Sequence, residues 1–358
     1  MAIKTNIPFT ADYVIIGGGT AGLTLASRLS ENSTESIVVL EAGSNLLEDP
    51  RAALGNRVIK EPQGKLLGGP SGISSQAFVA PSQSGIDAWS KLGPLKVSFP
   101  AAIQDPLCRA WVDTFKATGH GITADPFSGK STGGYSNLSA VDSETKTRSY
   151  AASAYGRSPM ERPNVHIVTE ALVQRILFKG LKESSVTAGG IEAVIQGEIH
   201  TITANKEVIV CAGALNTPKL LELSGIGNKE ILHQYNIHVV VNSPSVGENL
   251  QDHLMSGISF EVVNGVVTGD PLLRQEPEAV QAAMQLYMEH KTGPMTIRGV
   301  QSSSYMPLVY FQGQNSSTSI KEYLDGFFLR SSDRDHAIRE IIGQPDAPTC
   351  STILCILI

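Results

Sequence analysis

Three glycines near the start of the chain have a spacing that could bind phosphate. Gly17, Gly19 and Gly22 form a G-x-G-x-x-G pattern between an apolar run, Tyr13–Ile16, and an amphipathic segment that reaches Leu29. In such a pattern the first glycine permits a tight turn, the second lets a pyrophosphate approach the backbone, and the third lets the helix pack closely on the strand. A phosphate there meets free N–H groups at the positive end of a helix dipole. The spacing therefore predicts a strand–turn–helix unit that binds a dinucleotide.

An acidic residue follows at the distance that this chemistry requires. Glu41 ends a second apolar run, 37–41, and lies 19 residues after Gly22. A carboxylate in that place can accept hydrogen bonds from both hydroxyls of an adenosine ribose, and it repels the 2′-phosphate of NADP. The motif itself leaves FAD and NAD both open.

A second stretch, 64–77, is rich in glycine and serine. Such a composition is typical of a flexible linker, but Leu66, Leu67, Ile73 and Phe78 could anchor this one. We favour a backbone that lies against a flat ligand.

The elements that must position these residues continue through the first 255 residues. Strand-like runs are expected at 165–169, 172–178, 191–195 and 207–211, followed by a strand at 237–241. Residues 213–227 predict a second strand–turn–helix, with Thr217 as N-cap, Pro218 at the first helical position and Gly225 at the end. A helix is also expected at 101–118, with Trp111 on its buried face.

The character of the sequence changes after about residue 255. An antiparallel strand pair is expected at 257–267, an amphipathic helix at 277–290 and a strand at 306–311, whereas the apolar end, 345–358, has nothing after it to pack against. We predict a first domain over 1–255 and part of a second over 256–358.

Composition excludes several classes of protein. The 358 residues are 41% hydrophobic and carry a net charge of −6, without a Lys/Arg run, which argues against nucleic acid or an anionic membrane as partner. No apolar stretch is long enough to span a membrane, and no secretory signal begins the chain, so a cytoplasmic location is expected. The four cysteines have neither zinc-site nor disulfide spacing, and no metal site is predicted. The oligomeric state stays open.

Four separated segments together resemble the glucose–methanol–choline (GMC) oxidoreductase family. They are the turn at 17–22 with Glu41, the 64–89 stretch, the 213–227 stretch and the run Gly247–His253. The 213–227 stretch matches the family pattern at every constrained position. These positions are Gly213, Ala214, Thr217, Pro218, Leu220, Leu221, Ser224, Gly225, Ile226 and Gly227. The resemblance implies an α/β fold: a Rossmann-like FAD-binding domain with the beginning of an α+β, antiparallel-sheet substrate domain. It also implies oxidation of a primary or aryl alcohol, and it disfavours an NAD-dependent dehydrogenase.

The resemblance carries over to particular residues. The FAD pyrophosphate would be held by Gly17, Gly19, Thr20, Ala21 and Gly22. The adenosine ribose would be held by Glu41 and Ala42. The run from Gly68 and Gly69 to Ser74, Ser75, Gln76 and Ala77 would follow the pyrophosphate and flavin, and Gly213 would also bind the cofactor. The main chain of Val173 would meet the adenine, although a strand core residue is the simpler interpretation of Val173.

The sequence also departs from the family pattern. Ser74 stands where the family usually has asparagine, Ser75 where it has glycine, and Ala80-Pro81 where it has Arg-Gly. Ile73 stands where some members carry a histidine that links the flavin covalently, so FAD is expected to bind non-covalently. The eight histidines include no H-x-H or His–Asn constellation like the family's C-terminal proton-accepting pair, and the chain ends before that segment. We therefore predict no catalytic residue. Two functions stay open: an alcohol-oxidising flavoprotein, or a non-catalytic remnant that binds FAD or its ADP half.

Overall fold

The computed structural model describes most of the chain, in two compact units. The described residues are 7–44, 63–78, 94–98, 107–121, 132–182, 185–251, 256–266, 268–296, 300–307, 322, 324–326, 333–343 and 349–355. Unit 1 comprises Met1–Ser74 and Ser149–Glu261, and unit 2 comprises Ser75–Arg148 and Val262–Ile358. Across the described ranges, no helix is both long enough and apolar enough to cross a lipid bilayer.

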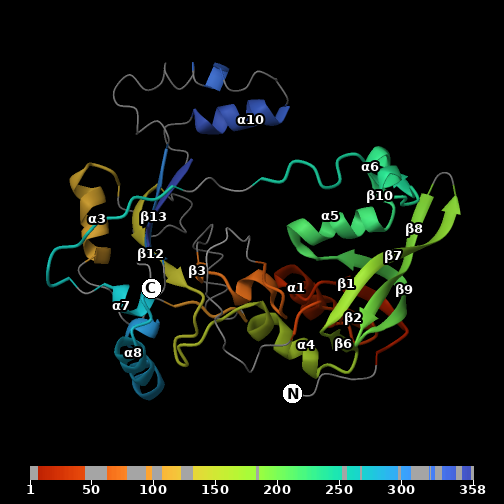
Figure 1. Ribbon diagram of the computed structural model, residues 1–358, viewed down its shortest axis with the longest axis horizontal. Helices are drawn as coiled ribbons and strands as arrows, with labels where there is room; N and C mark the ends of the chain where they lie inside the picture. The colour runs from red at the N-terminus through yellow and green to blue at the C-terminus, as the bar shows by residue number, and fades with distance from the viewer. Residues whose placement is uncertain are drawn as a thin grey trace. The chain divides into compact units, whose positions relative to one another are not determined.

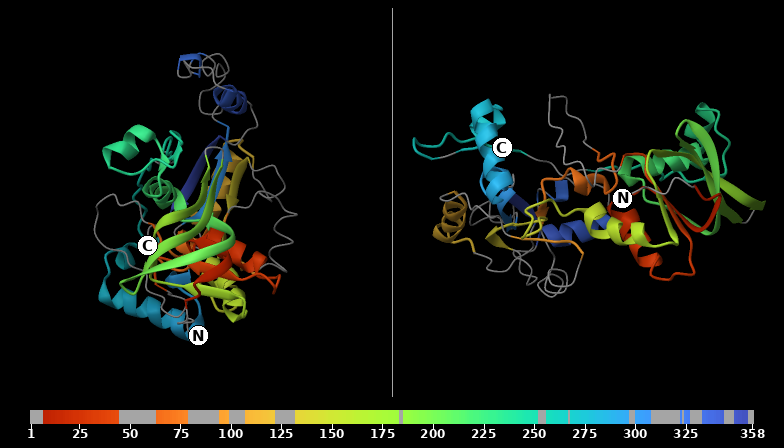
Figure 2. Two further views of the ribbon diagram at one scale, coloured as in Figure 1. Left: turned by 90° about the vertical axis from the view of Figure 1, so that its right-hand side faces the viewer. Right: turned by 90° about the horizontal axis from the view of Figure 1, so that it is seen from below.

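A six-stranded mixed sheet forms the centre of unit 1 (Figure 1). Its strand order is β6-β2-β1-β9-β8-β7. β1 (Thr10–Ile16) pairs in parallel with β2 (Ile37–Leu40) and with β9 (Glu198–Val210), and β2 pairs in parallel with β6 (Val165–Val168). β7 (Ala171–Lys182) and β8 (Ser185–Ile195) complete the sheet as an antiparallel ribbon, visible in Figure 2.

The predicted βαβ unit is confirmed. Helix α1 (Thr20–Leu29) connects the parallel strands β1 and β2. All four residues of β2 are buried, as expected for a parallel strand that is covered on both faces.

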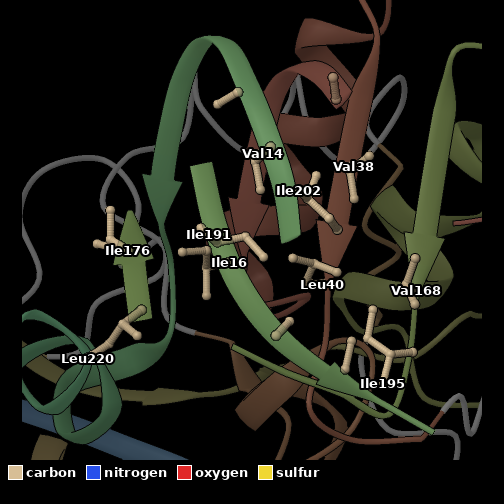
Figure 3. Packing of buried hydrophobic residues seen from close by; sticks show 14 residues of the cluster. Val14, Ile16, Val38, Leu40, Val168, Ile176, Ile191, Ile195, Ile202 and Leu220 are labelled. Carbon is tan, nitrogen blue, oxygen red and sulfur yellow. The ribbon is translucent and has the colours of Figure 1, made fainter. Parts of the chain in front are cut away.

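Two hydrophobic clusters of described residues cover the two faces of this sheet. On β1, Val14 and Ile16 enter one cluster and Ile15 the other, which follows from the two-residue period of a strand. The first cluster contains Leu220 of α5 (Gly213–Leu223) and is drawn in Figure 3. The second contains Leu23 of α1, together with Ala152 of the π-helix η2 (Ala152–Gly156), which α4 (Arg157–Glu161) follows.

Strands of unit 1 differ in length from the prediction. β7, β8 and β9 are longer than expected because each continues its ladder with a neighbour, and Gln196 and Gly197, with φ of 54° and 85°, make the tight turn from β8 to β9. The strand expected at 237–241 is wrong in extent. Only β11 (Val241–Asn242) forms, because its partner β10 (Ile226–Gly227) offers two residues for pairing.

The predicted start of α5 is wrong, and its predicted end is confirmed. The helix begins at Gly213 after Ala212, so Pro218 lies inside it and Thr217 is no N-cap. Gly213 has φ of 85° and turns the chain from β9 directly into the helix, one turn before the proline. At the other end Ser224 is the C-cap and Gly225, with φ of 86°, ends the helix. Helix α6 (Lys229–Gln234) follows, capped by Asn228.

Unit 2 contains short strands and separate helices. The strands are the antiparallel pairs β3 (Ala77–Phe78) with β5 (Leu138–Ser139) and β12 (Val300–Met306) with β13 (Cys350–Cys355), and β4 (Gly133–Ser136). The helices are α3 (Leu107–Ala117), α7 (Asp270–Leu273), α8 (Pro277–His290), η3 (Pro294–Thr296) and α10 (Asp333–Ile342). The predicted helix at 277–290 is confirmed. Half-buried Trp111 of α3 donates from Nε1 to the Ser303 carbonyl at 3.3 Å.

One expectation for the second half of the chain is wrong. The strand pair at 257–267 does not form over the described residues 256–266, where Ile258 and Phe260 are more than 80% exposed and no neighbouring strand pairs with them. Of the strand expected at 306–311, only 306 and 307 are described: Met306 ends β12, and 308–311 fall outside the described residues. In the apolar end, β13 pairs with the earlier strand β12.

The units differ from the predicted domains in one respect. The second boundary, 261/262, lies close to the expected 255/256, but unit 2 also includes Ser75–Arg148. The sequence analysis divided the chain at a single point, whereas unit 2 is assembled from two separate segments.

Candidate cofactor site

A cavity of about 880 Å³ opens at the carboxyl ends of the parallel strands in unit 1. Its lining includes the ends of β1, β2 and β9 and the N-termini of α1 and α5. The carboxyl edge of a parallel sheet is where α/β folds bind their ligands. Most of the predicted site residues line this one cavity: Gly17, Gly19, Thr20, Ala21, Glu41, Ala42, Gly69, Val173 and Gly213.

The three glycines of the turn have different local environments. Gly17 has φ of 104°, and a Cβ there would lie 2.3 Å from the Cys211 carbonyl oxygen. A Cβ on Gly22 would lie 1.9 Å from the Gly17 carbonyl oxygen, so Gly22 is needed for close helix–strand packing and does not line the cavity. At Gly19 the nearest atom to a Cβ would be the Gly69 Cα, 3.8 Å away. The space above Gly19 is therefore open to a ligand.

The N-terminus of α1 presents backbone donors to this space. Gly19 is its N-cap, and among the described residues no side chain caps the first turn. The first N–H groups of a helix have no partner within the helix and attract anions. Thr20 and Ala21 line the cavity at this point, so a phosphate fits there without a basic side chain.

Glu41 is buried and lies against the glycine turn. Its side chain is 7% exposed; Oε2 accepts from the Gly18 N–H at 2.8 Å, and Oε1 accepts from the Gly43 N–H at 2.7 Å. Burial raises the pKa of Glu41, and the two N–H groups and Lys65 oppose that rise. Each carboxylate oxygen retains a second acceptor position, so Glu41 can hold the turn and still accept a ribose hydroxyl.

The glycine- and serine-rich stretch is folded against the turn. The Gly68 N–H donates to the Gly18 carbonyl at 2.7 Å, and a Cβ on Gly69 would lie 2.9 Å from the Gly19 Cα. Leu66 and Leu67 are buried, whereas Ile73 is 47% exposed and anchors nothing. The linker interpretation is therefore wrong for residues 64–72, which end in the short helix η1 (Gly69–Gly72).

The remaining predicted residues lie outside the cavity lining. Gly68 and Ser74 belong to unit 1, and Gly68 has φ of 102° where the chain passes Tyr150. Ser75, Gln76 and Ala77 belong to unit 2, where Gln76 is 4% exposed and Ala77 pairs with Ser139.

Several cavity residues were missed by the sequence analysis. Lys65 and Lys219 add positive charge to the lining, Asn216 and Gln63 add amides, and the half-buried Cys211 adds a thiol whose pKa is raised by burial. The helix predicted after β9 could have indicated Asn216 and Lys219 as cavity residues. Its start was predicted about one turn too late, so these residues were not considered. Among the described residues, no group of histidine, cysteine and acidic side chains could hold a metal ion.

Comparisons with known proteins agree with this architecture. Residues 91–255 match the model of the GMC oxidoreductase N-terminal domain. The chain is 33% identical to a GMC oxidoreductase family protein, Mala s 12, of Malassezia sympodialis, over 71% of this chain and 53% of the relative. It is 32% identical to the oxygen-dependent choline dehydrogenase of Sinorhizobium fredii, over 68% of this chain and 53% of that enzyme. The chain thus spans about half the length of the curated relatives it matches.

Solved structures share the fold. An FAD-dependent oxidoreductase from Chaetomium thermophilum superposes with a TM-score of 0.79 at 23% identity, covering 97% of this chain and 72% of that one. A fungal aryl-alcohol oxidase superposes with a TM-score of 0.74 at 20% identity, covering 98% and 73%. These likenesses show the fold, and the 33% identity to a family member over 71% of this chain shows that the chain belongs to the GMC oxidoreductase family.

Proposed function

We propose that this chain binds FAD non-covalently in the cavity of unit 1 and serves an oxidoreductase that acts on a primary or aryl alcohol. The observation that carries the proposal is the convergence of the Gly17–Gly22 turn, Glu41 and the N-terminus of α5 on one cavity. Membership of the GMC family supports the same chemistry. Similar proteins include a choline dehydrogenase and an aryl-alcohol oxidase, and their names support the substrate class.

Each part of the cavity has a role in this proposal. The backbone of Gly19, Thr20 and Ala21 binds the pyrophosphate, and Glu41 with Ala42 binds the adenosine ribose. Val173 offers its main chain to the adenine at the edge of β7. When bound, the flavin supplies a two-electron acceptor for hydride from the alcohol.

The positive charges of the lining suit a dianionic pyrophosphate. Lys65 and Lys219 outnumber Glu41, the acidic side chain of the lining. Glu41 in turn disfavours a ligand with a 2′-phosphate on that ribose, because two negative charges would be brought together in a buried place.

Proton transfer is assigned to no residue of this chain. Histidine is the usual acceptor for such a proton, yet no histidine of the described residues lines the cavity. This observation favours the second candidate function, a chain that binds FAD or its ADP half without oxidising alcohols. A proton-transfer catalyst is worth roughly 10²–10⁴ in rate, so its absence would leave weak or no alcohol oxidation rather than change specificity.

The visible absorption spectrum of the purified chain tests both candidates. A bound flavin spectrum that bleaches when choline or benzyl alcohol is added without oxygen would support the oxidoreductase. A bound flavin that never bleaches would support the second candidate, and a chain that takes up no added FAD would overturn both. Acid precipitation tests the linkage: non-covalent FAD stays in the supernatant, whereas a yellow pellet would contradict it.

A further inference from the structure

Strand β12 of unit 2 carries a run of buried polar residues. Gln301, Ser302, Ser303 and Ser304 are each at most 3% exposed. Among the described residues of unit 2, buried polar side chains outnumber buried hydrophobic ones, the reverse of unit 1. A domain interior of this composition is costly unless its polar atoms are hydrogen-bonded.

Several of these atoms do have partners. The Asn137 amide donates from Nδ2 to Ser303 Oγ at 2.7 Å, and the Asn137 N–H donates to the Gln301 carbonyl at 2.8 Å. The Cys108 thiol donates to Gln301 Oε1 at 2.8 Å. Gln301 and Ser303 alternate along β12 and so share one face of it. The side chains of Asn137 and Gln301 therefore meet at the same face of this strand.

The other ends of the same two amides lack partners. Asn137 Oδ1 and Gln301 Nε2 are buried and make no hydrogen bond to any part of the chain that the structure describes. The same holds for Ser139 Oγ, two residues along the extended segment from Asn137. Gln301 Oε1 already accepts from the Cys108 thiol, so the atom of the Gln301 amide that still needs a partner is the donor Nε2. Each such group destabilises the fold when it is buried and left unsatisfied.

We propose that Asn137, Ser139 and Gln301 form an internal site for a small, neutral hydroxylic ligand. A hydroxyl group accepts a hydrogen bond from Gln301 Nε2 and donates one to Asn137 Oδ1, so it satisfies both amides at once. An anion cannot donate to Asn137, and a metal cation cannot accept from Gln301. The three side chains carry no charge. The hydroxyl can belong to water or to a short alcohol, and the site needs no flavin.

NMR of the full ¹⁵N-labelled chain distinguishes the two sources. The Gln301 side-chain amide is assigned as the signal that disappears in Gln301→Met. Cross-relaxation between that amide and a long-lived water, unchanged by methanol or benzyl alcohol, would identify water. A saturable shift of the amide with either alcohol would identify an alcohol. An amide that shows neither effect would overturn the proposal.

Stability of Ser139→Ala gives an independent test, because Ser139 Oγ makes no hydrogen bond within the described part of the chain. If the ligand is present, the substitution removes a hydrogen bond to it and lowers Tm by a few degrees. If the interior is dry there, it removes an unsatisfied group and leaves Tm unchanged or higher, which would overturn the proposal. Ser136→Ala, at an exposed position of β4, is the matched control and should leave Tm unchanged.

Discussion

At the scale of single residues, Glu41 combines three properties in one side chain. It lines the cavity, it is buried, and its two oxygens hold the N–H groups of Gly18 and Gly43. The sequence analysis assigned Glu41 to a ribose, and that assignment stays a prediction. The hydrogen bonds add a second task, since they fix the turn that is proposed to receive the pyrophosphate.

Glu41→Ala should weaken FAD binding by roughly ten- to a hundredfold, because charge-assisted hydrogen bonds contribute about 1.5–3 kcal/mol. Quenching of flavin fluorescence measures the affinity. Glu31→Ala is the control, since Glu31 lies outside the cavity lining and pairs at the surface with Arg28. Equal affinities of Glu41→Ala and the unaltered chain would remove Glu41 from the site.

The pH dependence of stability should separate Glu41 from Asp12. Burial raises the pKa of Glu41 above the ordinary value of 4.5, so the folded state binds that proton more tightly than the unfolded state. Its contribution to stability is therefore present below pH 4.5 and is lost as pH rises through the folded pKa. The Tm difference between the unaltered chain and Glu41→Gln should be larger at acidic than at neutral pH.

Asp12→Asn should show the opposite trend. The Ser36 N–H and hydroxyl lower the pKa of Asp12 below its ordinary value of 3.8. The contribution of Asp12 is present above pH 3.8 and is lost as pH falls through the folded pKa. Tm measured across the acidic range checks both variants, and parallel trends would contradict the assignment of opposite shifts.

Alanine at two glycines of the turn should separate folding from binding. Gly22→Ala places a Cβ 1.9 Å from the Gly17 carbonyl oxygen and should destabilise the chain by about 1–3 kcal/mol. Gly19→Ala makes only an ordinary 3.8 Å contact and should keep Tm, yet its methyl group enters the space proposed for the pyrophosphate. Loss of FAD binding with an unchanged Tm is therefore expected for Gly19→Ala alone.

At the scale of elements, Ser224 connects α5 to the sheet. Its hydroxyl donates to the Leu220 carbonyl at 2.6 Å and accepts from the Ile176 N–H of β7 at 2.8 Å, and the side chain is 7% exposed. The C-cap of α5 thus holds the helix whose N-terminus lines the cavity. This explains why a serine precedes the glycine that ends the helix.

Ser224→Ala should lower the free energy of unfolding by about 1–3 kcal/mol, because the Ile176 N–H would be buried without a partner. Urea denaturation measures the change. Ser33→Ala, at an exposed position in the same unit, should change stability by less than about 0.5 kcal/mol. Equal effects of the two substitutions would show that the Ser224 bonds contribute nothing.

At the scale of the whole molecule, the segment 256–266 exposes a short run of apolar side chains. Ile258, Phe260 and Val263 are 81%, 83% and 77% exposed. Exposed apolar groups this close together favour association in water. We expect the purified chain to self-associate through this segment.

The double variant Ile258→Ser, Phe260→Ser should weaken that association by about tenfold or more, since burial of one large apolar side chain is worth roughly 1.5–3 kcal/mol. Light scattering over a concentration series measures it. Phe9→Ser is the control, because Phe9 is 75% exposed in another part of the chain. An equal effect of Phe9→Ser would exclude a specific role for the segment.

Local sequence determined the elements that depend on neighbouring residues. The glycine spacing at 17–22, the apolar runs of β1 and β2, and the amphipathic pattern of α8 each act within a few residues, and the structure confirms those elements. The residues 213–227 also indicated the correct end of α5, because Gly225 can adopt a positive φ at little cost. The family followed from such local patterns.

Tertiary structure decided which of these segments meet. The pairing of β9 with β1 brings Cys211 and Gly213 to the glycine turn, almost 200 residues away in the sequence, and the hydrogen bond from Gly68 to Gly18 brings the glycine-rich stretch there too. Strand pairing across such separations depends on burial and on the free backbone groups of both partners, which no local window contains. The same reason explains why the described part of 257–267 forms no strand pair, why β13 pairs with β12, and why unit 2 combines two segments that are far apart in the sequence.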